Sequence, residues 1–168
     1  SNSFDCVIVR LLLEHLPDPM QCIQEALRIL KPGGRIVCID NDFSNHLSAY
    51  PKVESLATLY EAYCEARKRE GGHPEIGKML PSLLSRAGFS LIDFDIICAH
   101  SVIVGEDMFR QSEGLGIAYR LVKDGFLTSK DLSAIVSQWR EMLGEKCHGI
   151  IRQLYMAAGT KLGEGNAN

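Results

Sequence analysis

The stretch FDCVIVRLLLEHLPDPMQCIQEALRILKPGGRIVCID, residues 4–40, decides the fold of this 168-residue chain. An apolar run over residues 5–9 predicts one strand, and a second run over residues 35–40 predicts another. Runs that are apolar at nearly every position are typical of parallel strands that are covered on both faces. Because the residues between the runs carry helical signals, the stretch predicts a strand–helix–strand unit.

The helix between the two strands has clear start and stop signals. Asp18 can accept hydrogen bonds from the first turn, and Pro19 suits the first helical position because it has no N–H to leave unpaired. The sequence KPGG at residues 31–34 ends the helix. Between these signals, apolar residues recur at helical spacing and predict one buried face, made of Met20, Ile23, Leu27 and Leu30.

Beyond residue 40 the patterns predict further helices and strands. Pro81 is expected in the first turn of one helix or as a new start within it, and Thr128 with Asp131 forms a capping-box pattern. The expected elements are a polar loop over 41–46, helices over 51–70, 76–87, 107–123 and 128–144, and strands over 91–99 and 150–161. Residues 163–168 have the composition of a frayed tail.

Two blocks in this order carry a family resemblance. The sequences LEHLPDP (13–19) and RILKPGG (28–34), followed by a strand that ends in Asp40, resemble the second half of a class I S-adenosylmethionine-dependent methyltransferase. LLSRAGF (83–89) resembles the helix-to-strand turn near the end of that fold. The resemblance implies an α/β fold: the C-terminal half of a Rossmann-like sheet with about four strands and flanking helices. The last strand would be antiparallel, between the strands at Arg35 and Leu91.

The family's glycine-rich cofactor loop has no counterpart here. Such a loop follows a strand directly, whereas Gly33 and Gly34 precede a strand and Gly71 and Gly72 follow a helix. We therefore interpret residues 1–168 as a single partial methyltransferase domain that is inactive by itself. By resemblance, residues 4–100 form its core, residues 106–144 a helical insertion like a lid, residues 150–161 the closing strand and residues 163–168 the tail.

The composition indicates which partners and which cellular compartment to expect. A net charge of −3 and a pI near 5.9 give no electrostatic footprint for nucleic acid. No apolar run approaches the ~20 residues of a membrane span, so we expect no membrane partner. Six cysteines without C-x-x-C spacing predict buried free thiols in a reducing compartment, the cytoplasm, rather than a metal site or disulfides.

The resemblance implies that Arg10 and Leu11 border the methionine part of the cofactor S-adenosylmethionine. Arg10 suits that position because its forked donors match a carboxylate. The alternative is an ordinary surface arginine. His15 is the leading catalytic candidate, since histidine changes charge near neutral pH. A scaffold role beside Glu14 stays open for it.

The loop after the second strand supplies the acceptor-side candidates. Asp40 and Asn41 could bind a polar substrate and Asp42 could accept a proton, because ligands of open α/β sheets bind beyond the carboxyl ends of the strands. Short polar residues are also what turns prefer. Tyr60, with Tyr63, could line the substrate pocket, although a tyrosine stripe at helical spacing is also typical of core packing.

These residues support one leading functional hypothesis and one alternative from another class of protein. The leading hypothesis is methyl transfer to a small-molecule acceptor, and the alternative is a non-catalytic interaction module that retains half of the fold. A dinucleotide oxidoreductase is disfavoured because the two blocks are not that family's signature.

The strand at Cys6–Val9 would lack an outer neighbour, and it has no proline or lysine to protect it. We therefore expect self-association through this edge, as a homodimer.

Overall fold

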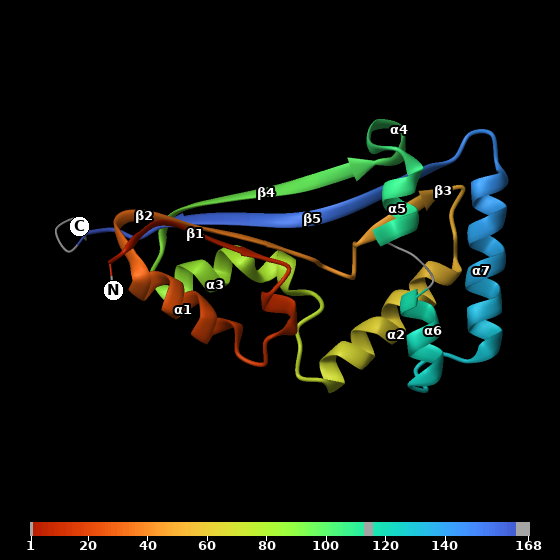
Figure 1. Ribbon diagram of the computed structural model, residues 1–168, viewed down its shortest axis with the longest axis horizontal. Helices are drawn as coiled ribbons and strands as arrows, with labels where there is room; N and C mark the ends of the chain where they lie inside the picture. Colours follow the sequence, from red (N-terminus) through yellow and green to blue (C-terminus); the bar gives the residue numbers. More distant parts are fainter. Residues whose placement is uncertain (1, 113–115, 164–168) are drawn as a thin grey trace. The chain divides into compact units, whose positions relative to one another are not determined.

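The chain, described here by a computed structural model over residues 2–112 and 116–163, has a mixed α/β fold with five strands (Figure 1). This confirms the fold class expected from the sequence. The chain divides into two compact units. The described residues of the first unit are 2–42, 71–97 and 154–163, and those of the second are 43–70, 98–112 and 116–153.

The predicted strand–helix–strand unit opens the first unit. Strand β1 (Phe4–Arg10) is parallel to β2 (Leu30–Asp40), and helix α1 (Pro19–Ile29) connects them after a 3-10 turn, η1 (Leu13–His15). The helix begins as predicted, because the Asp18 carboxylate accepts hydrogen bonds from the N–H groups of Met20 and Gln21 at 3.0 and 3.2 Å.

The rest of the first unit completes the sheet. A 3-10 turn, η2 (Ile76–Met79), leads into helix α3 (Leu80–Ala87), and Pro81 lies in the first turn of α3. Gly88 ends this helix with a left-handed φ of 100°, and β4 (Ser90–His100) follows. Strand β5 (Gly149–Thr160) is antiparallel to β2 and also pairs with β4, so the predicted position of the closing strand is confirmed.

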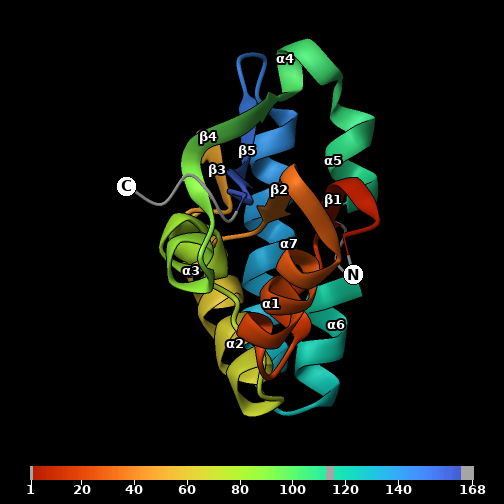
Figure 2. The ribbon, with the colours of Figure 1, turned by 90° about the vertical axis from the view of Figure 1, so that its left-hand side faces the viewer.

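Helices α1 and α3 both cover the same face of β1 and β2 (Figures 1 and 2). The core between them contains Val9, Ile36 and Cys38 from the strands, together with helical residues such as Ile23 and Leu84. The other face of these strands is less covered, and Val37 and Ile39 of β2 are half-buried there. Ile8, which points away from the core, is 68% exposed, whereas Val9 is 5% exposed.

The second unit is mainly helical. A short strand, β3 (Leu47–Tyr50), is antiparallel to residues 149–152 of β5. Phe109 and Ile135 are fully buried in its core. The capping box of Thr128 and Asp131 is confirmed, with both of its hydrogen bonds present. The helices are α2 (Ser55–Arg69), α4 (Ser101–Val104), α5 (Glu106–Ser112), α6 (Gly116–Lys123) and α7 (Ser129–Gly144).

Four structural expectations need correction. The strands at residues 5–9 and 35–40 are covered on one face only, because all described helices of the first unit pack on the same side. Strand β3 was not predicted. The helix expected over 107–123 is two helices, α5 and α6, and residues 113–115 lie outside the described part. All six cysteines are free, yet the expectation that they are buried is wrong for most of them: only Cys38 is buried, Cys22 and Cys64 are half-buried, and Cys6, Cys98 and Cys147 are exposed.

None of the described helices is long and apolar enough to span a membrane. Residues 164–168 of the predicted tail lie outside the described part of the chain.

Candidate functional site

The candidate site lies where β1 and β2 end in the first unit. Because the two strands are parallel, their carboxyl ends meet at one edge, and the last pair of the register joins Arg10 to Ile39. Leu11 N–H still bonds to the carbonyl of Ile39 at 2.8 Å. The two loops that follow therefore start side by side, and they carry most of the predicted site residues.

Asp40 joins these two loops. Its Oδ2 accepts hydrogen bonds from the N–H groups of Leu13 at 2.9 Å and Glu14 at 3.4 Å, and its Oδ1 accepts one from the N–H of Asn41 at 3.0 Å. The side chain is fully buried. Burial raises the pKa of the Asp40 carboxyl, because it disfavours the charged form, while the backbone N–H groups of Asn41, Glu14 and Leu13 act in the opposite direction.

Glu14 is the second buried carboxylate of the site. Its side chain is 5% exposed, and Oε1 accepts a hydrogen bond from Asn41 Nδ2 at 3.1 Å. The same oxygen lies 3.2 Å from His15 Nε2, and the His15 side chain is 41% exposed. His15 is thus an accessible imidazole oriented by a buried carboxylate, an arrangement that serves either a general base or a scaffold.

The segment before α3 closes the same edge from another side. Lys78 Nζ lies 3.5 Å from Oδ2 of the fully buried Asp42. Gly77 N–H bonds to the carbonyl of Asn41 at 2.9 Å, and a Cβ at Gly77 would lie 2.8 Å from that oxygen. This approach therefore requires glycine. His73 N–H bonds to the carbonyl of Glu14 at 2.8 Å.

The remaining predicted residues are distributed unevenly. Arg10 is exposed at the end of β1, and Leu11 follows it with a left-handed φ of 50°. Tyr60 belongs to the second unit, where it is buried against Phe43 and His46. The structure thus brings together Arg10, Leu11, His15, Asp40, Asn41 and Asp42, and the roles assigned to all seven residues stay predictions.

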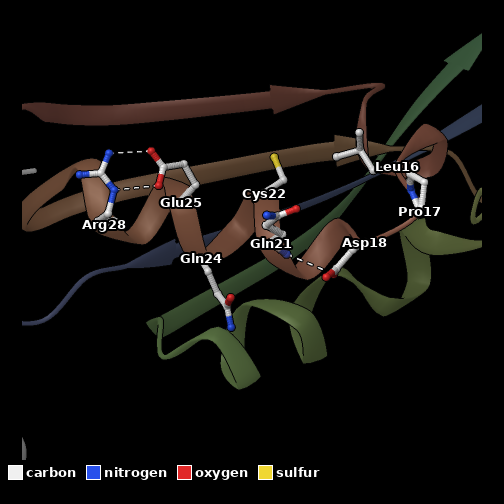
Figure 3. A pocket seen from close by; sticks show the side chains of 8 residues that line it. All are labelled: Leu16, Pro17, Asp18, Gln21, Cys22, Gln24, Glu25 and Arg28. Atoms are coloured by element: carbon white, nitrogen blue, oxygen red, sulfur yellow. Dashed lines mark hydrogen bonds and ion pairs between the residues drawn. The ribbon is translucent and has the colours of Figure 1, made fainter.

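A cavity of about 690 Å³ runs along α1 (Figure 3). Asp18 and Cys22 are among its lining residues, as is the ion pair of Glu25 with Arg28 at 2.7 Å. Leu16 and Pro17 bring it next to the loop after β1, but none of the predicted site residues lines it. We assign it no part in the site.

Sequence reasoning missed three members of the site. His73 and Lys78 were given no role, and Glu14 was treated only as a neighbour of His15. Their contacts reach across the chain to Glu14 and Asp42, so no local pattern marks them. The one available signal was Gly77, a glycine inside an otherwise helical pattern, which often marks a close backbone approach. Within the described residues, no three His, Cys, Asp or Glu side chains group as a metal site.

Comparison with known proteins shows what this chain is similar to. Residues 1–38 match the family model described as a methyltransferase domain. The chain also superposes on phosphoethanolamine N-methyltransferase 2 of Haemonchus contortus, with a TM-score of 0.52 and 18% identity, over 96% of this chain and 34% of that one. The first 38 residues are thus similar to a methyltransferase domain, and the fold is similar to that of a methyltransferase.

A second solved structure shows how much of the fold is shared. A Bacillus halodurans protein classed among methyltransferases superposes with a TM-score of 0.51 and 18% identity, over 96% of this chain and 71% of that one. At this level of identity the likeness shows the fold alone.

Curated relatives match shorter segments. The demethylmenaquinone methyltransferase of Listeria welshimeri is 37% identical over 62 residues, which is 37% of this chain and 23% of that protein. An uncharacterized protein of transposon TN4556 from Streptomyces fradiae is 34% identical over 90 residues, which is 54% of this chain and 25% of that protein. The chain thus spans about a quarter of the length of these two relatives.

Proposed function

We propose that the chain forms the acceptor side of an S-adenosylmethionine-dependent methyltransferase that acts on a small molecule, and that it is inactive by itself. One observation carries this proposal: Asp40 binds the N–H of Leu13 and so joins the loop that bears His15 to the loop that bears Asn41 and Asp42. Titratable and polar groups from both strand ends therefore converge at the edge where open α/β sheets bind ligands. The family match supports the same chemistry.

Part of the cofactor fits the residues present. Arg10 is exposed beside the site, and among the described residues no ion pair or side-chain hydrogen bond holds its guanidinium, so it can meet a carboxylate. Arg10 and Leu11 would then hold the methionine end of S-adenosylmethionine, which is the cofactor bound in the Haemonchus contortus structure. Among the described residues, no glycine-rich turn joins a strand to a helix, so we propose that a further segment of the full-length enzyme makes the other cofactor contacts.

Methyl transfer depends mainly on how the acceptor atom is oriented toward the methyl group. When bound, the cofactor supplies a methyl group on a positively charged sulfur, which keeps the electron pair of the broken bond while the acceptor atom bonds to carbon. Orientation alone can be worth effective molarities of ~10⁵ M or more. In this chain Asn41 would help to orient the acceptor. His15 or Asp42 would take a proton where the acceptor must lose one, and a scaffold role remains the alternative for His15.

The first acceptor to try is an aromatic quinone precursor. The name of the Listeria welshimeri relative states that demethylmenaquinone is its substrate. A protein from Desulfotalea psychrophila, 29% identical over 119 residues, is named a ubiquinone/menaquinone C-methyltransferase. These matches cover 23% and 43% of those proteins, and they support the acceptor class as a starting point.

Self-association and compartment belong to the same proposal. β1 lies at the end of the described strand order, and its Cys6 and Ile8 are exposed, so its edge is open to a strand from a second copy. A two-fold dimer through Cys6–Val9 is the simplest product. The six free cysteines support a reducing compartment, the cytoplasm.

Binding and transfer assays test this function. We expect calorimetry to show no micromolar binding of S-adenosylmethionine to the 168-residue chain. A form extended by the coding sequence upstream of Phe4 should transfer labelled methyl groups to a demethylquinone. In that form Arg10→Ala should weaken cofactor binding by ~1.5–3 kcal/mol if it makes a charge-assisted bond. Micromolar binding by the chain alone would contradict the proposed inactivity.

A non-catalytic module is the second candidate, and the absence of a glycine-rich turn from residues 1–168 favours it. The upstream coding sequence separates the two. A strand followed by a glycine-rich turn favours the enzyme. A natural start codon at this position, together with no transfer by any extended form, favours the module.

A further inference from the structure

The turn after β1 has backbone hydrogen bonds of its own, from His15 N–H to Leu12 C=O and from Leu16 N–H to Leu13 C=O, but no side-chain cap. Leu11 adopts a left-handed φ of 50°, which is unfavourable for a residue with a Cβ. The 3-10 turn η1 that follows has Leu12 at its N-cap, and no side chain of the cap accepts a hydrogen bond. The first N–H groups of such a turn need acceptors from elsewhere. Yet this turn carries Glu14 and His15.

Asp40 supplies the missing acceptor from the neighbouring strand. It is the residue after the last β1–β2 pair, so its carboxylate lies at the start of η1. Its Oδ2 accepts from both Leu13 and Glu14, while Oδ1 accepts from Asn41 N–H. Both oxygens are thus engaged with the backbone, and the side chain is fully buried.

The turn is fixed from its other side as well. His73 donates its backbone N–H to the carbonyl of Glu14 at 2.8 Å, and its ring Nε2 lies 3.3 Å from the carbonyl oxygen of Pro17. Asn41 Nδ2 donates to Glu14 Oε1. With Asp40 on one side and His73 on the other, the backbone of Glu14 is bonded at both its N–H and its C=O.

We propose that Asp40 is a positioning residue, which acts through the η1 turn to hold Glu14 and His15 in place and does not itself contact the acceptor. This role rests on the proposed function. It follows because a buried carboxylate with both oxygens engaged has no surface to offer a ligand, whereas a charged acceptor holds backbone N–H groups more strongly than a neutral one.

The protonation of Asp40 gives this role a pH dependence. Since burial raises the pKa of the Asp40 carboxyl above its ordinary value, the closed turn binds a proton at Asp40 more tightly than a form in which the turn has opened to water. Protection of the turn should therefore rise as the pH falls through that raised pKa. The titratable groups on the surrounding elements are Glu14 and His15 on η1, Cys38 on β2, Asp42 after β2, His73, and Lys78 on η2.

Amide hydrogen exchange by NMR on the 168-residue chain tests the proposal without any activity. In wild-type protein, the protection factors of the Leu13 and Glu14 amides should rise together between neutral and acidic pH. Asp40→Asn keeps the shape but replaces one of the two acceptor oxygens with an NH2 group, which cannot accept from an N–H, so protection at these two amides should drop about tenfold at neutral pH. It should also lose its pH dependence there, while amides such as Ile36 and Cys38 in β2 keep their protection.

Asp42→Asn is the matched control, because Asp42 is equally buried on the same loop and pairs with Lys78 instead. It should leave the Leu13 and Glu14 amides unchanged. If Asp40→Asn does not fold, the pH series on wild-type protein still decides. Flat protection of both amides with pH, or an Asp40→Asn loss spread evenly over the first unit, would overturn the proposal.

A transfer assay on an active extended form separates this role from substrate binding. A positioning residue predicts a lower kcat for Asp40→Asn with the KM for acceptor nearly unchanged, whereas a raised KM at constant kcat means direct substrate contact and overturns it. If no form transfers methyl groups, the proposed function fails, and the exchange result still decides whether Asp40 holds the turn.

Discussion

The two faces of β1 and β2 have similar composition but different surroundings. On one face Val9, Ile36 and Cys38 are buried under α1 and α3. On the other face Ile8 is 68% exposed, although it neighbours Val9 in the chain. The apolar composition of a strand face therefore does not predict whether helices pack on that face. We therefore expect stability to depend on the buried face of these strands and self-association to depend on the exposed one.

The largest expected effect compares one isoleucine from each face. Ile36→Ala should lower the free energy of unfolding by about 2–5 kcal/mol, because it leaves a cavity at a fully buried position. Ile8→Ala should change it by no more than about 0.5 kcal/mol. Denaturant titration followed by circular dichroism measures both. Equal losses would mean that the exposed face is covered in solution.

The contrast between a packed site and an exposed site can also be tested with two lysines, Lys161 and Lys31. Lys161 Nζ donates to the carbonyls of Leu27 and Leu30 at 2.8 and 2.7 Å, at the end of α1. Lys161→Met keeps the length but removes these charged donors, and should cost about 1.5–3 kcal/mol. Lys31 forms an exposed pair with Asp5, so Lys31→Met should cost about 0–1 kcal/mol. If the two variants unfold at the same denaturant concentration, the contrast does not extend to charges.

A third substitution weakens the start of α1, one of the two helices that pack on the buried face of β1 and β2. Asp18→Ala removes the acceptor for two N–H groups at the start of α1, and should cost about 0.5–2 kcal/mol. Asp18→Asn is the control, since asparagine caps nearly as well. The unfolding midpoint measures both, and a midpoint of Asp18→Ala equal to that of wild type would show that packing on the sheet alone fixes this end of the helix.

The smallest effect on stability is expected from Ile8→Lys. The position is exposed, so the free energy of unfolding should change by no more than about 0.5 kcal/mol. The charge should nevertheless abolish self-association, because lysine on an edge strand blocks pairing with a second copy. Sedimentation at tens of micromolar compares the two proteins. A wild-type chain that is already monomeric would refute self-association through β1.

The strand–helix–strand unit was predictable because its signals are local. Asp18, Pro19 and the KPGG block each act within a few residues of the ends they define. What covers the strands was not predictable in this way, and the expectation of two covered faces was wrong for Ile8. Strand β3 escaped notice because its four residues exist as a strand only through pairing with β5.

The site residues also divide into those that the local sequence predicts and those that depend on tertiary packing. Position at a strand end was enough to nominate Asp40, Asn41 and Asp42, and parallel pairing brought them beside His15. The contacts of His73 and Lys78 depend on how η2 packs against the loop after β2, and no local pattern contains that information.

The place of β5 also has a consequence for how the chain folds. β5 lies between β2 and β4, and Thr160 pairs with Arg35 near the opposite end of the chain. Contacts between such distant residues slow folding, because the chain must close a long loop before the pairing stabilises it. During synthesis on the ribosome, β2 and β4 emerge long before the strand that joins them. The nascent chain therefore exposes unpaired edges of β2 and β4 until residues 149–160 emerge and form β5.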